Sequence, residues 1–316
     1  MKKKFMFLAL LLFFNFCNCR ISTSLLFDNL GMETIGSYFT ENNYDNLITC
    51  TDFEKQKETG VVQDKSIPEL SGIAASRQNK GSYWVHNDSG NPNDIFLIDS
   101  LGNTLLTVRI GNAYNRDWED ICVGAGPDST KTYVYVGEIG DNNTKYPVKA
   151  IYRIEEPTIQ DGLSRIIMDA DIIYFNYPND KIYNAETLML DPKTKNLFIV
   201  TKGDSSEVFI LPFPQIPNKT TTVNYITSLP IYLATAGDIS PKGDEILIKN
   251  YTQIFYWKRF LNEGLIDMLK RKPLLIPYSP EVQGEAIGWN FNATGFFTST
   301  EISAANEQKI FYYKRK

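Results

Sequence analysis

Five times along the chain an acidic residue precedes a short apolar segment, and a similar succession of apolar and polar stretches follows each time. The acidic residues are Glu69, Glu119, Glu186, Asp238 and Glu285. They recur at intervals of roughly 50 residues, a period that is typical of solenoids, propellers and other repeat architectures. The chain is therefore predicted to consist of five related units.

Each unit is predicted to begin with a short strand, followed by a turn and by further strands. The turns are rich in Gly, Pro, Asn and Asp, which favour the backbone angles of hairpins. Second strands are expected at 82–85, 132–136, 196–200, 245–248 and 295–298, and third strands at 94–98, 150–154, 208–211, 253–257 and 309–313. Fourth strands are expected around 104–110, 172–175, 222–226 and 273–276, and only 258–271 looks partly helical, chiefly over 260–269.

Four antiparallel strands per unit predict an all-β fold, a β-propeller with five four-stranded blades. The fifth unit ends after three strands, whereas strand-forming residues at 46–51 and 60–62 precede the first unit. Pairing this N-terminal segment as the outer strand of the last blade would close the ring and cover two sheet edges. Six blades are the alternative, if 20–62 and 156–185 contain further strands.

The first 19 residues are predicted to be an export signal. Lys2 to Lys4 form a basic start, and the apolar stretch that follows is about 12 residues long, too short for an ordinary membrane span. A lead-in at 20–42 and a propeller domain at 43–316 would follow. We expect a secreted or periplasmic protein. The alternative is lipid attachment at Cys17 or Cys19, which would be its only link to a membrane.

Composition narrows the class of partner. A net charge of −5 and a pI of about 5.2 argue against a nucleic-acid partner, which requires a basic face. Two cysteines, Cys50 and Cys122, lie in the predicted domain, and an oxidising compartment would permit a disulfide between them. Two cysteines make no disulfide framework, however, and Cys122 is expected to be a buried apolar residue. We expect a monomer.

The propeller geometry predicts where the five acids lie. The first strand of a blade is nearest the axis, and antiparallel pairing puts its start beside the end of the second strand. Crowded carboxylates repel each other and are relieved by a cation, by protonation or by lysine. An oxygen-only ligand set suits Ca²⁺, and a chain with one histidine excludes a multi-histidine zinc site. The five acids are thus predicted calcium ligands; alternatively, they hydrogen-bond backbone groups and hold the blades together.

Polar residues at the ends of the second strands are predicted to surround the acids. The candidates for proton transfer are His86, Asp88 and Asp141. The candidates for substrate contacts are Lys202, Lys249, Tyr251 and Glu301. Two alternatives remain open: His86 only hydrogen-bonds within its own loop, and the two lysines pair with the axial acids. Asp120, beside the inner acid of the second unit, is expected to bond from blade to blade.

Several short motifs carry a family resemblance. In order along the chain they are Glu69-Leu-Ser-Gly72, His86-Asn-Asp-Ser-Gly90, Asp117-Trp-Glu-Asp120, Gly137-Glu-Ile-Gly-Asp-Asn142, Tyr152-Arg153, Glu156-Pro157, Ala185-Glu186 and Asp191-Pro192. Over roughly residues 66–300 the chain resembles a family of secreted bacterial β-propeller proteins with no assigned activity. This resemblance implies the fold and export but no reaction.

A fainter resemblance is to the calcium-activated apyrases, five-bladed propellers with an axial calcium ion. Glu69-Leu70-Ser71 and Trp118-Glu119 look like the starts of their first two inner strands, which implies that Glu69 and Glu119 face calcium. The other three units depart from that pattern, and no nucleotide-contacting residues can be matched.

Two functions therefore compete. The first is a Ca²⁺-dependent hydrolase of a phosphoric ester or anhydride, or of a lactone. The second is a non-enzymatic propeller that binds a glycan or a protein on the acid-bearing face, with a structural ion or none.

Overall fold

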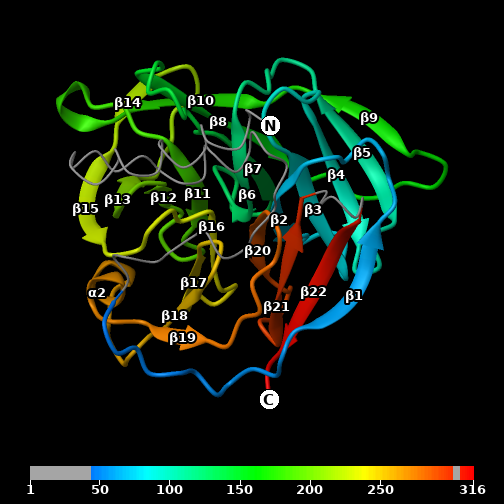
Figure 1. Ribbon diagram of the computed structural model, residues 1–316. Helices are drawn as coiled ribbons and strands as arrows, with labels where there is room; N and C mark the ends of the chain where they lie inside the picture. Colours follow the sequence, from blue (N-terminus) through cyan, green and yellow to red (C-terminus); the bar gives the residue numbers. More distant parts are fainter. Residues whose placement is uncertain (1–43, 302–306) are drawn as a thin grey trace, which may run out of the picture. The chain divides into compact units, whose positions relative to one another are not determined.

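The computed structural model describes residues 44–301 and 307–316. These residues form the five-bladed β-propeller that the sequence predicts, and the first strands of the five blades contact one another around its axis (Figure 1). The predicted export signal at 1–19 and the lead-in at 20–42 lie outside the described residues.

In the first four blades the strands follow one another outward from the axis. Blade 1 contains β2 (Leu70–Ala75), β3 (Ser82–Asn87), β4 (Asp94–Asp99) and β5 (Thr104–Ile110), and blade 2 contains β6 (Trp118–Ala125), β7 (Thr132–Glu138), β8 (Val148–Glu155) and β10 (Asp171–Asn176). Blade 3 contains β11 (Ala185–Leu190), β12 (Leu197–Thr201), β13 (Ser206–Leu211) and β15 (Asn224–Leu229), and blade 4 contains β16 (Ala236–Ile239), β17 (Glu245–Lys249), β18 (Ile254–Lys258) and β19 (Leu274–Ile276).

Blade 5 closes the ring with strands from both ends of the chain. It consists of β20 (Gly284–Trp289), β21 (Gly295–Thr300) and β22 (Gln308–Lys314), and β1 (Lys57–Val62) pairs antiparallel with β22. The predicted closure by an N-terminal strand is therefore confirmed. The earlier segment expected at 46–51 is not a strand, because it contributes only a single bridge between Thr49 and Leu275.

Two further segments run back to the preceding blade and pair parallel with its outer strand. β9 (Arg165–Met168) lies beside β5, and β14 (Thr220–Thr222) lies beside β10. The helical elements are short: α2 (Leu265–Lys270) falls within the stretch predicted to be helical, and η2 (Pro178–Asp180) is a single 3-10 turn. Among the described residues, no helix has the length and apolarity needed to cross a membrane.

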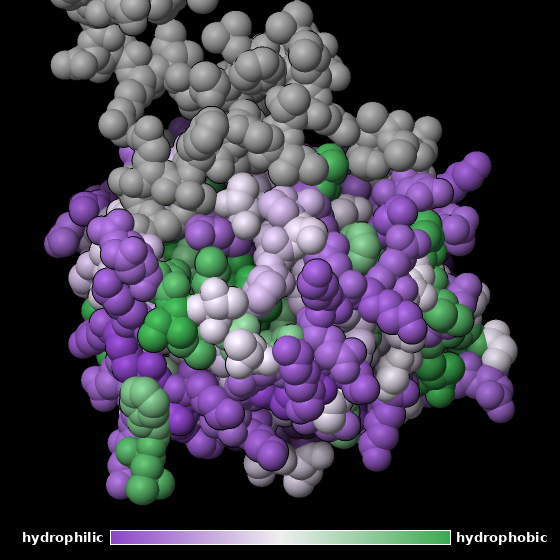
Figure 2. Space-filling view, turned by 60° about the horizontal axis from the view of Figure 1, so that its bottom comes forward, coloured by the Kyte–Doolittle hydropathy of each residue, from purple (hydrophilic) through white to green (hydrophobic). Residues whose placement is uncertain are grey.

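The core lies within and between the blades. The indole rings of Trp84, Trp118, Trp257 and Trp289 are fully buried. Cys122 is buried as expected, and both it and Cys50 are free thiols in this structure. On the outside, the face turned forward in Figure 2 is largely hydrophilic, with hydrophobic residues in small separate groups.

Candidate metal centre

A β-bulge near the start of the first strand fixes one side chain per blade in equivalent positions. In blades 1, 2, 3 and 5 the pairing register between the first and second strands skips one residue of the first strand. Blade 4 shows the same feature, because the N–H of Thr235 donates to the Lys249 carbonyl and the next residue, Ala236, also pairs with Lys249. A bulge turns a side chain out of the regular alternation of a strand. We call this set the inner tier: Ser71, Glu119, Glu186, Thr235 and Glu285.

A second set of equivalent positions lies one residue beyond the paired end of the second strand. The N–H groups of Asp88, Lys202 and Glu301 donate to the carbonyls that lie two residues before the inner tier. Tyr251 and Ile139 hold the same position in blades 4 and 2. We call this set the outer tier: Asp88, Ile139, Lys202, Tyr251 and Glu301. The two tiers bring polar side chains from all five blades to the end of the axis where the inner strands begin, and those of every blade except blade 4 include a charged one.

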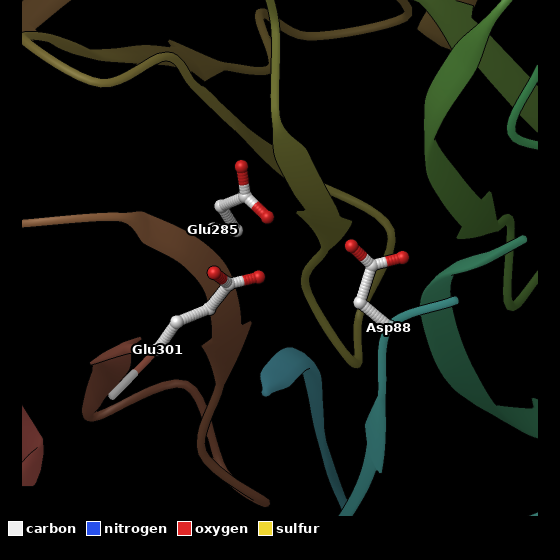
Figure 3. A group of neighbouring side chains, drawn as sticks. All are labelled: Asp88, Glu285 and Glu301. Carbon is white, nitrogen blue, oxygen red and sulfur yellow. The ribbon is translucent and has the colours of Figure 1, made fainter. Parts of the chain in front are cut away.

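Two groups of three carboxylates form there, and they share Asp88. In each group, one oxygen from every member lies within 4.8 Å of the others. One group joins Asp88 to Glu285 and Glu301, whose carboxylates point toward one another (Figure 3). The other joins Asp88 to Asp117 and Glu119. Blades 5, 1 and 2 thus supply carboxylate oxygens at a spacing that could hold a metal ion.

Positive charge comes from Lys202 of blade 3. The Lys202 ammonium lies 3.0 Å from Glu186 and 3.7 Å from Glu285, and it donates to the Tyr251 hydroxyl at 3.0 Å. The Tyr251 hydroxyl in turn donates to Glu285. Lys202 therefore balances acids of blades 3 and 5, and Asp88 has no lysine partner within 44–301 and 307–316.

The pKa values follow this uneven charge. Burial, together with the charge of Glu285, raises the pKa of Asp88 to about 7 and that of Glu301 to about 10. Burial also raises the pKa of Glu119. Burial acts on Glu285 too, but the Lys202 ammonium helps to lower its pKa below the usual value. A raised carboxyl pKa means that the ionised form lacks compensating positive charge, so the cluster favours bound protons or a bound cation.

Glu69, predicted as a ligand, lies outside the cluster. Its carbonyl accepts the N–H of Asp88, so Glu69 corresponds to Asp117 and Ser71 takes the position of Glu119. The Glu69 carboxylate is exposed and accepts a hydrogen bond from Asn91 at 2.6 Å. The sequence alignment of the first unit was therefore wrong by two residues.

Asp238 also lies away from the cluster. It is three residues beyond Thr235, toward the end of the axis where the inner strands finish. Its carboxylate accepts the backbone N–H of Trp289 in blade 5 at 2.8 Å, and burial raises its pKa to about 7. Asp120 makes a similar link, since it accepts the N–H of Leu188 in the next blade. The blade-to-blade role expected of Asp120 is confirmed, and Asp238 shares it.

His86 and Lys249 occupy the same position on their second strands and point into the interior. Both are fully buried. The His86 ring lies edge-on to Trp118, its Nδ1 lies 2.9 Å from the Asn87 carbonyl, and burial lowers its pKa to about 4. The Lys249 ammonium donates to the Gly284 carbonyl, and burial lowers its pKa to about 8. The expectation that both residues line the polar face is wrong, because the blades pack face to face at these positions.

Asp141 braces a loop instead of facing a ligand. Its carboxylate lies 3.0 Å from the Lys149 ammonium, and both side chains are buried. It also accepts the backbone N–H groups of Lys145 and Tyr146. These bonds fix the loop after β7, so Asp141 has no free oxygen directed at the cluster and does not fit a catalytic role.

Two residues of the site carried no role in the sequence prediction. Asp117 was visible as an acid beside Trp118, but only its position in the structure brings it to Asp88. Thr235 holds the inner-tier position of blade 4, and its buried hydroxyl has no hydrogen-bond partner among the described residues. Neither a bulge nor a threonine leaves a distinctive signal in the sequence.

No protein-family model matches this chain, and no curated protein matches it. The assignment of the site therefore depends on its own geometry.

Proposed function

We propose that the protein binds Ca²⁺ at the start of the inner strands, with Asp88, Asp117 and Glu119 as its ligands. The observation that carries the proposal is the meeting of these carboxylates within 4.8 Å. Among the described residues, none of the three makes an ion pair with lysine or arginine, whereas Lys202 is committed to Glu186 and Glu285. Several partly buried carboxylates without a counter-charge are costly, and a divalent cation offsets that cost.

In the neighbouring group, Asp88, Glu285 and Glu301, the repulsion between carboxylates is reduced without a metal ion. Glu301 and Glu285 share a hydrogen bond, which requires a proton between them, and Lys202 lies 3.7 Å from Glu285. This pair therefore holds a proton beside the ion site. Asp88 belongs to both groups and connects the two.

The donor set favours Ca²⁺ over other ions. All the side chains are oxygen donors, and the single histidine is buried in the interior with its ring against Trp118. Ca²⁺ accepts 6–8 oxygens in irregular geometry, whereas Mg²⁺ demands a near-ideal octahedron. Asp88 and Asp117 are only half-buried, which leaves room for water or a ligand oxygen.

The reaction that fits this arrangement is hydrolysis of a phosphoric ester or anhydride, or of a lactone. Bound Ca²⁺ would supply a Lewis acid for a phosphoryl or carbonyl oxygen. Glu301 is half-buried, carries a proton at neutral pH because of its raised pKa, and lies beside Asp88. It can therefore donate a proton to a leaving group. Because the sequence also predicts an export signal, we propose that the protein is an exported Ca²⁺-dependent hydrolase.

Replacing Glu301 by Gln separates binding from catalysis. Gln keeps the shape but carries no transferable proton, so turnover should fall by about 10²–10⁴-fold while Ca²⁺ affinity changes little. Glu307→Gln, an exposed acid before β22, is the control and should leave both unchanged. The measurements are calcium titration calorimetry and turnover of phosphate esters, nucleoside triphosphates and lactones, with and without a chelator. A wild type that binds Ca²⁺ but turns over none of them would contradict the hydrolase and favour the glycan- or protein-binding alternative.

The raised pKa values predict how Ca²⁺ binding depends on pH. Folded Asp88 holds a proton up to about pH 7, whereas an unfolded Asp releases it near pH 4, so this group stabilises the ion-free fold at low pH and the stabilisation is lost as pH rises toward 7. Ca²⁺ must displace that proton. Its affinity should therefore rise by up to about tenfold per pH unit below pH 7. Melting temperatures with excess Ca²⁺ and with a chelator, at about pH 5 and about pH 8, should show the larger calcium effect at the higher pH. An equal effect at both would contradict the proposed ligands.

A further inference from the structure

A cavity of about 360 Å³ lies at the other end of the axis, where the inner strands finish. Its volume lies in the range of small-molecule sites, about 300–1,000 Å³. Apolar and small side chains form most of its wall, among them Cys122, Leu190, Pro192, Ile239 and Phe291. Two side chains of opposite charge, Arg77 and Asp238, complete the lining.

Arg77 brings a guanidinium group that the protein leaves largely unsatisfied. Its Nη1 donates to the Phe291 carbonyl at 3.3 Å, and the group lies 6.0 Å from the centre of the Phe291 ring. Within the described part of the chain it makes no direct ion pair. Burial lowers its pKa even though the charges of Asp238 and Glu156 act in the opposite direction. A guanidinium has five N–H donors, so most remain available for a planar anion such as a carboxylate.

Asp238 brings the complementary group. It accepts the N–H groups of Trp289 and of Ile239, and no described lysine or arginine pairs with it directly. A carboxylate has about four acceptor sites, so two remain for a donor in the cavity. The charges of Asp238 and Arg77 interact, but the two side chains do not form a direct ion pair.

We propose that this cavity binds an α-amino acid with an apolar side chain. Its carboxylate would bind Arg77, its ammonium group would bind Asp238, and its side chain would pack against Leu190, Pro192 and Phe291. A simple carboxylate would leave Asp238 without a partner of opposite charge, and a simple amine would leave Arg77 without one. Burying either charged group unpaired costs free energy, so the site selects for both charges on one small molecule. The site is independent of the proposed calcium centre, which involves none of these residues.

The first test uses the wild-type protein in a chelator and three probes that share one side chain. L-leucine carries both charges, 4-methylpentanoate lacks the ammonium group, and 3-methylbutylamine lacks the carboxylate. Titration calorimetry should show binding of leucine, and affinity for each analogue at least about tenfold weaker, as expected when a charged hydrogen-bonding group loses its partner. No binding of leucine, or equal binding of either analogue, overturns the proposal.

The second test assigns the two contacts. Arg77→Gln and Asp238→Asn should each weaken leucine binding at least about tenfold. Lys80→Ala is the matched control, because Lys80 lies on the same turn and 5.6 Å from the same Phe291 ring but does not line the cavity. An unaltered melting temperature in each variant shows that the fold is retained. If Lys80→Ala weakens binding as much as Arg77→Gln, or if Asp238→Asn has no effect, the assignment is wrong. Failure of calcium binding in the wild type would leave this result untouched.

Discussion

The Asp88→Asn variant should bind Ca²⁺ at least about a hundredfold more weakly than the wild type. Asp88 is the carboxylate common to both groups of acids, and its loss removes one of the three proposed Ca²⁺ ligands. Asn keeps the backbone hydrogen bond from Asp88 to the Glu69 carbonyl. Because the ion-free protein already holds Asp88 protonated up to about pH 7, a neutral side chain should also be tolerated by the fold. Calcium titration calorimetry measures the affinity, and melting in a chelator measures the fold.

Glu69→Gln is the control for that experiment. Glu69 belongs to the same blade and the same end of the axis, but its exposed carboxylate bonds to Asn91 and lies outside both groups. Its replacement should leave Ca²⁺ affinity within about twofold of the wild type, since surface charges act weakly through solvent. An equal loss in both variants would support the ring of five acids that the sequence suggested. An unchanged affinity in Asp88→Asn would refute the site altogether.

The architecture was readable from the sequence because its signals are local and repeated. Each hairpin turn contains residues that fix backbone angles, and each strand is a short apolar run between such turns. A missing fourth strand in the last unit and a spare strand at 60–62 predicted the closure that β1 makes. The extra strands β9 and β14 were missed, since parallel pairing with a preceding blade depends on distant segments that the pattern does not connect.

The alignment of the acids within the units could not be read in the same way. A bulge adds one residue to a strand and leaves no mark in composition, so Glu69 looked equivalent to Glu119 although Ser71 holds that position. The resemblance to the calcium-activated apyrases implied both glutamates as calcium-facing, and the structure brings only Glu119 to the cluster. An error of two residues moves a ligand from the axis to solvent.

The sequence also could not predict the direction in which side chains at the strand ends point. Blades pack against each other on both faces, so a polar residue such as His86 can be buried on either side, and alternation does not decide which. Asp88, two residues further along the chain, lies past the last strand pair and faces the axis. The fold alone therefore predicts that a side chain faces the axis only for residues, such as Asp88, that lie just past the paired end of the second strand.

Asp141 is buried beside Lys149 and should contribute to stability, which replacement of Lys149 should reveal. In Lys149→Met the Asp141 carboxylate keeps its two backbone N–H partners but loses the ammonium group at 3.0 Å, and both side chains are buried in the wild type. Breaking a buried pair by removing one charge typically costs about 3–5 kcal/mol of unfolding free energy. Denaturant unfolding of the chelated protein measures this loss. Lys131→Met is the matched control, because its pair with Glu155 is exposed to solvent and its loss should leave the unfolding free energy nearly unchanged.

The double variant Asp141→Asn with Lys149→Met decides between a structural and a catalytic role. Removing both charges leaves no uncompensated ion in the interior, so the double variant should be more stable than the sum of the two single losses implies. If Asp141 serves only the loop after β7, Ca²⁺ affinity and turnover per folded molecule should stay close to the wild type in all three variants. A stable Asp141→Asn protein with turnover reduced by a hundredfold or more at unchanged Ca²⁺ affinity would contradict this, and would return Asp141 to the position that the sequence first gave it.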